Sequence, residues 1–172
     1  MIRIAITDGG AHGVDPAVDF IQLRNLHCSS RDLAALVRKL VDVNAPRILV
    51  NDRTDVAIAC GAAGVHLRDR SVSPTVIRRI APAGFVITVA CHDTEAVFRA
   101  ADEGADYAIL APIFAPLSKL ATTPRLGLGR LHEIATRTII PVIALGGITA
   151  ENASRCVEAG AAGIAGITMF RR

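Results

Sequence analysis

The chain has 172 residues, of which 51% are hydrophobic, 20% are charged and 3% are aromatic, and its formal net charge is +3. This length suits one well-buried core, so we expect a single domain over residues 1–172. Few aromatic residues and no run of Lys or Arg argue against a nucleic-acid partner. No stretch without Asp, Glu, Lys or Arg is longer than that over residues 138–150, which is shorter than the about 18 apolar residues that cross a bilayer. No membrane partner is expected.

The N-terminal and cysteine patterns both indicate a cytoplasmic protein. Strand-like residues begin at residue 2, without the charged start, apolar stretch and small-residue cleavage site of a leader peptide. The cysteines show neither CxxC pairing nor the short spacing of a disulfide framework; they are Cys28, Cys60, Cys91 and Cys156. We expect reduced thiols and no structural zinc.

Short β-rich apolar runs alternate with helical patterns along the chain, which is typical of a parallel sheet built from βα units. Eight strands are predicted, over residues 2–7, 19–24, 47–51, 64–67, 85–90, 107–112, 141–146 and 163–168. Six helices are predicted between them, over residues 31–43, 53–61, 73–81, 93–103, 127–137 and 150–159. This alternation predicts an α/β fold.

Eight such strands predict a (β/α)₈ TIM barrel that is pared down, with its first and eighth helices short or missing. Only residues 8–18 separate the first two strands, and they contain three glycines and a proline, which disfavour a helix. Too few residues follow residue 168 for a last helix. A flavodoxin-like doubly wound sheet is the alternative fold, but the even spacing of the strands and the lack of a clear edge strand favour the barrel.

The two missing helices would be neighbours in the ring, so the gap is expected to expose one apolar face of the barrel wall. Strands one and eight are rich in isoleucine, and alternate side chains of a strand point outward. The helix over residues 31–43 or a second subunit could cover this face. We predict a homodimer, because a two-fold interface uses the same patch twice.

The loops after strands seven and eight of a TIM barrel commonly bind phosphate through backbone N–H groups. Gly146 and Gly147 end strand seven just before a helix, where backbone can approach an anion closely. Ile167 and Thr168 end strand eight in the same way. Tight turns alone are the alternative explanation, but the two loops together predict a phosphate site. A Gly147→Val change is expected to abolish phosphate binding and to leave the fold mostly intact.

Other polar residues stand at the ends of strands on the same rim. They are Asp8, Gln22, Arg24, Asn51, Asp52, His66, His92, Ser118 and Lys119. A single His or Asp at a turn is more often a cap or a hydrogen-bond partner than a catalyst. The convergence of so many such residues nevertheless predicts a binding site.

Six blocks of sequence follow one another in a familiar order: ITD (6–8), IQLR (21–24), VNDRTD (50–55), GAAGVHL (61–67), PIF (112–114) and ALGGI (144–148). Over nearly the whole chain, this string resembles the thiamine-phosphate synthase family and its close relative, the thiazole tautomerase TenI. The resemblance implies a phosphorylated thiazole as substrate. In the synthase this thiazole displaces pyrophosphate from an aminopyrimidine, with Mg²⁺ holding the pyrophosphate. The tautomerase isomerises a thiazole carboxylate phosphate by proton transfer, without a metal.

The resemblance assigns substrate binding to Gln22, Arg24, Asn51, Ser118 and Lys119, and phosphate binding to the loops after strands seven and eight. Several positions depart from the synthase pattern: Leu26 replaces a Lys, Ser71 the second metal-binding Asp, Ala90 a Ser and Pro116 a Thr. Asp52 remains as one metal-binding carboxylate, and Asp69 is the candidate substitute for the second. We therefore expect no cofactor, with Mg²⁺ bound only if synthase activity is retained.

A metal-independent tautomerase is the main hypothesis, with His92 as the catalytic acid and base. Imidazole titrates near neutral pH, and His92 matches the tautomerase's presumed proton-transfer histidine. Asp93 is a better helix cap than His92, and Cys91 is a rival proton shuttle. Two alternatives stay open: a Mg²⁺-dependent synthase, and a catalytically silent binding or regulatory homologue that has kept the phosphate loops.

Overall fold

The computed structural model describes residues 1–9, 11–25, 27–42, 46–69, 71–115 and 124–171. Within these residues eight parallel strands close into a barrel in chain order, so that β8 pairs with β1. The strands are β1 (Ile2–Thr7), β2 (Phe20–Leu23), β3 (Arg47–Asn51), β4 (Gly64–Leu67), β5 (Val86–Cys91), β6 (Tyr107–Leu110), β7 (Val142–Ala144) and β8 (Gly163–Gly166).

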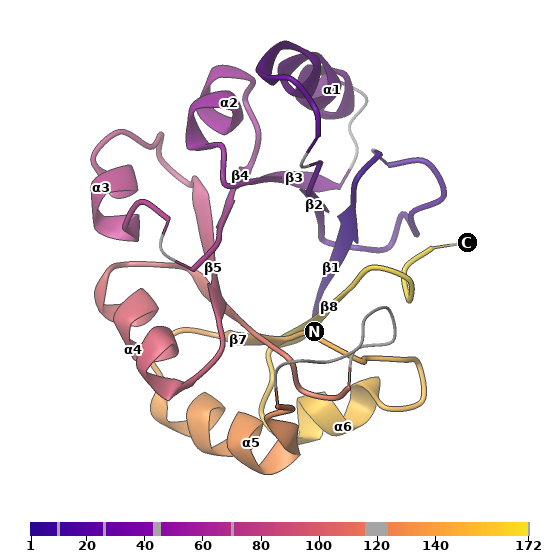
Figure 1. Cartoon of the computed structure of the whole chain (residues 1–172), viewed down its shortest axis with the longest axis vertical. Coiled ribbons are helices and arrows are strands. Elements are labelled where there is room, and N and C mark those ends of the chain that lie inside the picture. Colours follow the sequence, from indigo (N-terminus) through magenta and orange to yellow (C-terminus); the bar gives the residue numbers. More distant parts are fainter. Residues whose placement is uncertain (10, 26, 43–45, 70, 116–123, 172) are drawn as a thin grey trace.

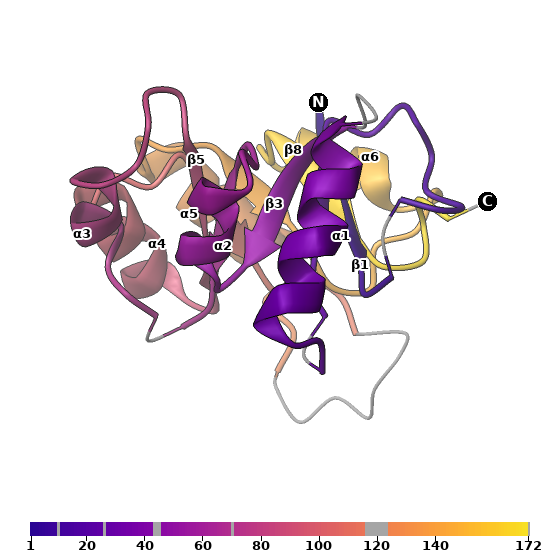
Figure 2. The same ribbon diagram turned by 90° about the horizontal axis from the view of Figure 1, so that it is seen from above.

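Six helices in the described residues surround the barrel (Figure 1). They are α1 (Ser30–Asp42), α2 (Thr54–Ala59), α3 (Pro74–Arg78), α4 (Thr94–Asp102), α5 (Gly127–Arg137) and α6 (Ala153–Glu158). Figure 2 shows α1 from the side, lying along the barrel wall next to β3. Because each helix follows a strand, the strand-to-helix loops gather at one rim, where the strands end.

The predicted (β/α)₈ barrel is confirmed, and every predicted strand and helix has a counterpart in the structure. The bounds of β1, β3, β4 and α5 match the prediction to the residue. Helix α6 begins three residues later than predicted, because residues 149–152 form a turn instead. In this turn the N–H of Thr149 donates to Oδ1 of Asn152 at 2.9 Å.

Strand alternation divides the apolar core into two layers. The side chains that fill the barrel interior are Ile4, Ile6, Phe20, Leu49, Val86, Ile109, Ile143 and Ala165. The opposite faces of the strands pack on the helices, where Val37, Val97 and Ile134 are fully buried. The interior is therefore packed with side chains, so a ligand site belongs at its open end.

No described helix covers the barrel wall between β8 and β1, and two irregular segments lie over it instead (Figure 1). We call residues 11–18 and 167–171 the closing segments. Val14 and Arg171 form an isolated antiparallel bridge, and the N–H of Asp15 donates to the carbonyl of Phe170 at 2.8 Å. The expected shortage of helices at this place is confirmed.

The closing segments also cover the barrel wall. Ala5 of β1 and Ile164 of β8 point outward, and they are 3% and 1% exposed. Val18 and Phe170 from the closing segments belong to the same apolar cluster. The expectation of a bare apolar face at the gap is wrong, because the chain covers it with its own loops. The homodimer stays a prediction, but an exposed apolar face at the gap no longer supports it.

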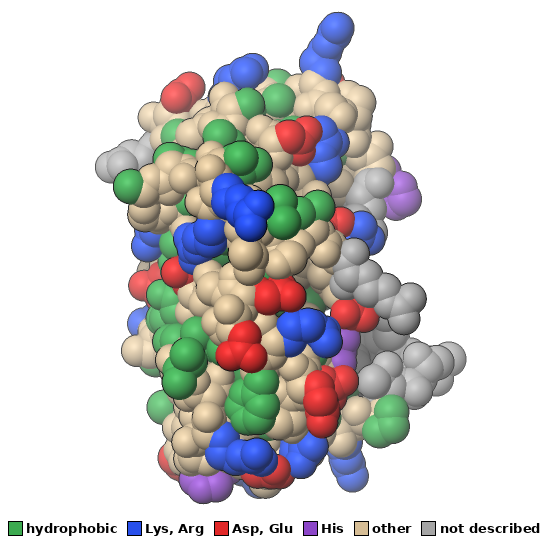
Figure 3. All heavy atoms as spheres, turned by 90° about the vertical axis from the view of Figure 1, so that its left-hand side faces the viewer, with side chains coloured by type: hydrophobic (Ala, Val, Ile, Leu, Met, Phe, Trp, Pro, Cys, Tyr) green, Lys and Arg blue, Asp and Glu red, His purple; other side chains and the backbone are tan. Residues whose placement is uncertain are grey.

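The charge pattern of the surface tests the expectation that the chain has no nucleic-acid partner. On the side of the molecule shown in Figure 3, basic and acidic side chains alternate and no continuous basic stripe is visible. Such a stripe is what a nucleic-acid backbone follows. None of the described helices combines the length and the apolar character of a membrane-spanning segment.

Candidate functional site

Polar side chains fill the end of the barrel at which the strands finish, which we call the mouth. Gln22 of β2 and Asn51 of β3 are both buried there, and Nε2 of Gln22 donates to Oδ1 of Asn51 at 3.2 Å. Beside them, Nδ1 of His66 on β4 lies 2.9 Å from Oγ1 of Thr88 on β5. The barrel is apolar in its depth and polar at its mouth, which makes the mouth the candidate site.

Gln22 carries an unsatisfied atom. In the part of the chain that the structure describes, its buried Oε1 has no hydrogen-bond partner, and the side chain is only 2% exposed. An unmet buried acceptor costs about 1–3 kcal/mol, so such an atom calls for an explanation. The amide nitrogen is already used by Asn51, and the oxygen needs a donor that the described residues do not supply.

His66 is uncharged at neutral pH. Burial, together with the positive charge of Arg24, lowers the pKa of His66 to about 4. The ring therefore acts in the mouth as a hydrogen-bonding partner for Thr88 and not as a cation for phosphate. Among the described residues of this rim, the positive charges belong to arginines.

Asp52 follows β3 with a left-handed φ of 58°. Its Oδ2 accepts from Nε of Arg68 at 2.8 Å and from Nη2 of the same side chain, while Oδ1 accepts from the hydroxyl of Ser71. Partial burial raises the pKa of the Asp52 carboxyl, but the hydrogen bonds from Ser71 and Arg68 outweigh it and hold this pKa below its usual value. Both oxygens of Asp52 are thus engaged by protein groups.

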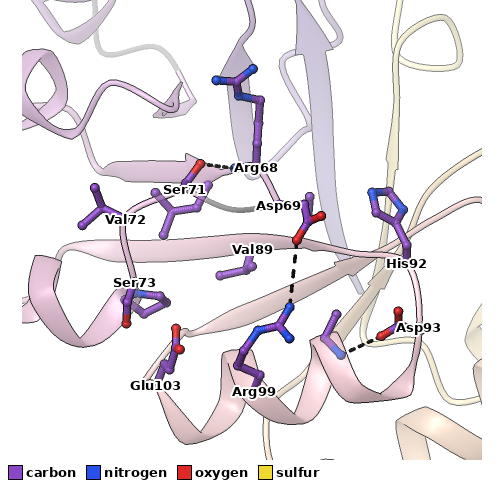
Figure 4. A pocket seen from close by; sticks show the side chains of 14 residues that line it. Arg68, Asp69, Ser71, Val72, Ser73, Val89, His92, Asp93, Arg99 and Glu103 are labelled. Carbon is purple, nitrogen blue, oxygen red and sulfur yellow. Dashed lines mark hydrogen bonds and ion pairs between the residues drawn. The ribbon is translucent and has the colours of Figure 1, made fainter.

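The structure does not bring Asp69 to Asp52. Arg68 and Asp69 extend to opposite sides of the loop after β4 (Figure 4), and Oδ1 of Asp69 lies 3.9 Å from Nη2 of Arg99 on α4. Among the residues with described positions, no group of three or more His, Cys, Asp and Glu side chains could hold a metal. Since Mg²⁺ needs several hard oxygen ligands, these residues do not fit a resident Mg²⁺ ion.

His92 is exposed at the end of β5, and its Nδ1 lies 2.8 Å from the carbonyl oxygen of Ala111. A carbonyl only accepts, so Nδ1 carries the proton and Nε2 is the basic nitrogen of the neutral ring. The cap of α4 is Asp93, which accepts from the N–H of Ala96 at 2.7 Å, as the sequence predicts. His92 is therefore oriented by the loop after β6, and its role as acid and base stays a prediction.

Cys91 is not a proton shuttle. The side chain is fully buried and belongs to the apolar layer between strands and helices. Burial raises the pKa of its thiol to about 12, so the thiolate is absent near neutral pH. The rivalry with His92 that the sequence left open is thereby removed.

The glycines after β7 are required by close packing. Gly146 and Gly147 have φ values of 98° and 62°. A Cβ at Gly146 would lie 2.8 Å from Cα of Pro112, and one at Gly147 would lie 2.3 Å from the carbonyl oxygen of Ala115. The loop after β6 rests on both glycines. The expectation that Gly147→Val leaves the fold intact is therefore wrong.

The N–H groups of these loops still suit an anion. Among the described residues, the N–H groups of Gly147, Ile167 and Thr168 donate to no protein acceptor. Strands β7 and β8 are paired, so the two loops are neighbours on the rim. Unused N–H groups on adjacent loops are a common phosphate-binding arrangement, and the phosphate site stays a prediction.

The remaining predicted residues divide in two. Arg24 is exposed just beyond β2, and its backbone N–H donates to the carbonyl of Thr7 at 2.7 Å. Its charge acts on His66, which places it near the mouth. Ser118 and Lys119 lie outside the described residues, as do Leu26 and Pro116.

A cavity of about 450 Å³ opens beside the mouth, between α3 and α4 (Figure 4). Its wall includes His92, Asp69, Arg99, Val89 and Glu103. Neither Gln22 nor Asn51 lines it, whereas Arg68 and Ser71 do, so the cavity is lateral to the mouth and adjoins it at the loop after β4. His92 stands at the border between the two.

Sequence reasoning missed Arg68 and Thr88. Thr88 is the register partner of His66, and Arg68 follows His66 by two positions, which places both side chains on one face of the strand. That spacing was the available signal for Arg68. Its contact with Asp52 depends on a left-handed residue that no spacing reveals.

A family model described as thiamine monophosphate synthase matches residues 10–170. A thiamine-phosphate synthase from Methanoculleus marisnigri is 44% identical over 153 residues, which make up 87% of this chain and 72% of that protein. A putative thiamine-phosphate synthase 2 from Aquifex aeolicus is 41% identical over 156 residues, with 89% of this chain and 83% of that protein covered.

The solved structures agree with this. A thiamine phosphate pyrophosphorylase from Pyrococcus furiosus has a TM-score of 0.84 and 27% sequence identity, over 97% of this chain and 85% of that one. The similarity therefore extends over the whole barrel.

Proposed function

The chain belongs to the thiamine monophosphate synthase family, and on that premise we propose that it joins a phosphorylated thiazole to an aminopyrimidine pyrophosphate. The thiazole forms a bond to the aminopyrimidine, and the bond between the aminopyrimidine and pyrophosphate breaks. The relatives named thiamine-phosphate synthase support this reaction more than the tautomerase that the sequence put first. The chain is accordingly a transferase of thiamine biosynthesis.

The unmet oxygen of Gln22 is the observation that carries this proposal. An aminopyrimidine presents amino N–H groups, which are the donors that Oε1 lacks. A thiazole carboxylate presents oxygen acceptors, which an amide oxygen repels. A buried acceptor in the mouth therefore supports an amino-bearing ring as one of the substrates.

The remaining groups can be assigned around that ring. The thiazole phosphate lies on the N–H groups of Gly147, Ile167 and Thr168, and the pyrophosphate lies toward Arg24 and Arg68 on the opposite part of the rim. Positive groups fixed where negative charge develops on the leaving pyrophosphate favour its departure. The family's Mg²⁺ would hold pyrophosphate, but the described acids do not fit it, and none of these roles depends on it.

The proposal is tested with the purified chain and both substrates. Product is measured as thiamine phosphate after oxidation to a fluorescent thiochrome, together with released pyrophosphate. Gln22→Met removes the acceptor at similar volume, and the affinity for the aminopyrimidine pyrophosphate should fall about tenfold, the value of one good hydrogen bond. Binding of thiazole phosphate should not change.

Thr94→Val is the matched control, since Thr94 carries the other buried oxygen without a described partner and lies on α4 outside the mouth. It should leave both affinities unchanged. Equal affinity of Gln22→Met and the unaltered chain for the aminopyrimidine pyrophosphate would contradict the assignment.

Isomerisation of a thiazole carboxylate phosphate is the second candidate function. The observations that favour it are His92 at the rim, oriented by the carbonyl of Ala111, and an Asp52 that is engaged by Arg68. If the chain is a tautomerase, His92→Gln should lower the isomerisation rate at least about hundredfold, and no ring joining should occur. A folded chain that binds thiazole phosphate and forms neither product would be the silent homologue.

A further inference from the structure

We propose that Arg68 is the built-in cation of the mouth: it clamps Asp52, keeps divalent cations from that carboxylate, and itself binds the phosphate groups of the substrate. This inference rests on the proposed function for the identity of the substrate as a pyrophosphate ester. It concerns the carboxylate of Asp52, where the family's metal would be expected. The described acids around it do not fit a metal ion.

The fold places Arg68 beside Asp52 without any long connection. Asn51 of β3 is the register partner of His66 on β4, and the N–H of Asp52 donates to the carbonyl of His66 at 2.8 Å. Asp52 and Arg68 therefore continue two paired strands just past their ends. Two positions separate Arg68 from His66, which directs its side chain toward the mouth.

The clamp uses both carboxylate oxygens. Nε and Nη2 of Arg68 meet Oδ2 of Asp52, and the hydroxyl of Ser71 meets Oδ1. The loop is folded to allow this, because the N–H of Arg68 donates to Oγ of Ser71 at 3.1 Å. A divalent cation at Asp52 would have to displace the guanidinium or lie against its positive charge, with Ser71 supplying a hydroxyl where a second acid is needed.

The guanidinium keeps a second edge for an anion. Arg has five N–H donors in a planar fork, and the bonds to Asp52 use the edge that holds Nε and Nη2. The Arg68 side chain is 59% exposed, so its other edge can be reached from the mouth. A planar fork suits two phosphate oxygens at once, and Arg24 adds a second positive charge to the same rim.

An ordinary surface ion pair is the competing explanation, and the chain provides a control for it. The Arg99 side chain is equally exposed at 59% and lies 3.9 Å from Asp69. Both arginines line the lateral cavity, but Arg99 projects from α4 and pairs with Asp69, whereas Arg68 pairs with Asp52 at the ends of β3 and β4 (Figure 4). If Arg68 were only a surface ion pair, Arg68→Met and Arg99→Met would behave alike.

The experiment uses the full chain with two probes, Mn²⁺ alone and inorganic pyrophosphate. Mn²⁺ binding is followed by electron paramagnetic resonance, and pyrophosphate binding by calorimetry in EDTA. The unaltered chain should bind pyrophosphate in EDTA and show no stoichiometric Mn²⁺ site. Arg68→Met should lose about tenfold in pyrophosphate affinity, the value of one charge-assisted hydrogen bond, and Arg99→Met should lose nothing.

A gain-of-site variant completes the test. Arg68→Gly with Ser71→Asp removes the clamp and supplies a second acid, and it should acquire a stoichiometric Mn²⁺ site. Circular dichroism and thermal melting establish that each variant is folded. If Arg68→Met does not fold, Arg68→Lys keeps the charge without the fork, and weaker pyrophosphate binding by this variant is the supporting result.

Two outcomes would overturn the inference: a stoichiometric Mn²⁺ site in the unaltered chain that Asp52→Asn removes, or equal pyrophosphate binding by the Arg68 and Arg99 variants. Failure of the proposed function appears separately. Ring joining that requires Mg²⁺ would sink this inference and leave the proposed function standing. Pyrophosphate binding in EDTA without any ring joining would do the reverse.

Discussion

The mouth has two parts, one formed by side chains and the other by backbone N–H groups. On the side of β2 to β4, side chains form it, and the main ones are Gln22, Asn51 and Arg68. On the side of β7 and β8, the loops offer backbone N–H groups, and Gly147 cannot accept a Cβ because Ala115 lies too close. A part made of side chains can change its chemistry by one substitution, whereas a part made of backbone is kept by packing. The first part is therefore where members of one fold can differ in reaction.

The largest effect is expected on the backbone part. Gly147→Val should lower the free energy of unfolding by about 4 kcal/mol, because it combines a left-handed φ with a clash against backbone. Urea denaturation measures this. Gly129→Ala is the control, since no atom lies within 4 Å of its Cβ and α5 should gain about 0.5–1 kcal/mol. A Gly147→Val chain of unchanged stability would show that this part is not fixed by packing.

The next effect separates the parts by pH, because only the side-chain part titrates. The pKa of His66 falls from its ordinary 6.5 to about 4 in the folded chain, so the unfolded chain binds the proton more readily. The stability that the uncharged His66 contributes to the folded chain is fully present above pH 6.5. It is lost as the pH falls toward 4, by about 3 kcal/mol in all. The loss from Asp52 comes lower, as its carboxyl protonates below its ordinary pKa of 3.8.

His66→Gln should remove the pH dependence of the unfolding free energy between pH 6.5 and 4. It should keep the loss of stability below pH 3.8 that comes from Asp52. Urea denaturation at a series of pH values from 8 to below 3 is the measurement, so that both pH ranges are covered. A slope that persists unchanged between pH 6.5 and 4 in His66→Gln would mean that another group carries it.

A smaller effect tests whether the two parts bind independently. Asn51→Leu leaves Nε2 of Gln22 without its acceptor, and the affinity for the aminopyrimidine pyrophosphate should fall about tenfold. The affinity for thiazole phosphate should stay the same, because no hydrogen bond among the described residues joins this pair to the loops after β7 and β8. Calorimetric titration of each substrate alone gives both values, and equal losses would contradict the division of the mouth.

The smallest effect is expected just behind the rim. Cys91→Ala should leave the rate of ring joining or isomerisation unchanged, since the thiol is buried and protonated. Its stability should fall by about 1 kcal/mol for the lost buried sulfur. A steady-state assay with the two substrates checks the rate, and a large drop in a folded Cys91→Ala chain would bring the thiol back as a proton carrier.

The sequence predicts the barrel well because the patterns that indicate it are local. The apolar runs that become β3 and β4, and the helical stripe of α1, are each visible within a few residues. The family follows from short ordered blocks in the same way. The polar rim is also predictable, because parallel strands that end at Gln22 and Asn51 must end side by side.

What the sequence does not predict depends on contacts between distant segments or on single dihedral angles. The cover over Ala5 and Ile164 comes from the meeting of residues 11–18 with residues 167–171, and no periodicity signals it. The Arg68 clamp requires the left-handed φ of Asp52. The close approach of Ala115 to Gly147 likewise turns a glycine that suggested ligand contact into one that packing also demands.

The closing segments determine where the barrel opens locally. Segments held by a few loop hydrogen bonds open at lower free energy than paired strands, so amides over residues 11–18 and 167–171 should exchange with solvent early. The closing segment over residues 167–171 also carries the N–H groups of Ile167 and Thr168. An anion held by those groups binds the closed form alone and so slows the opening. Substrate binding would then stabilise the closed form of the barrel wall between β8 and β1, where the ring lacks helices.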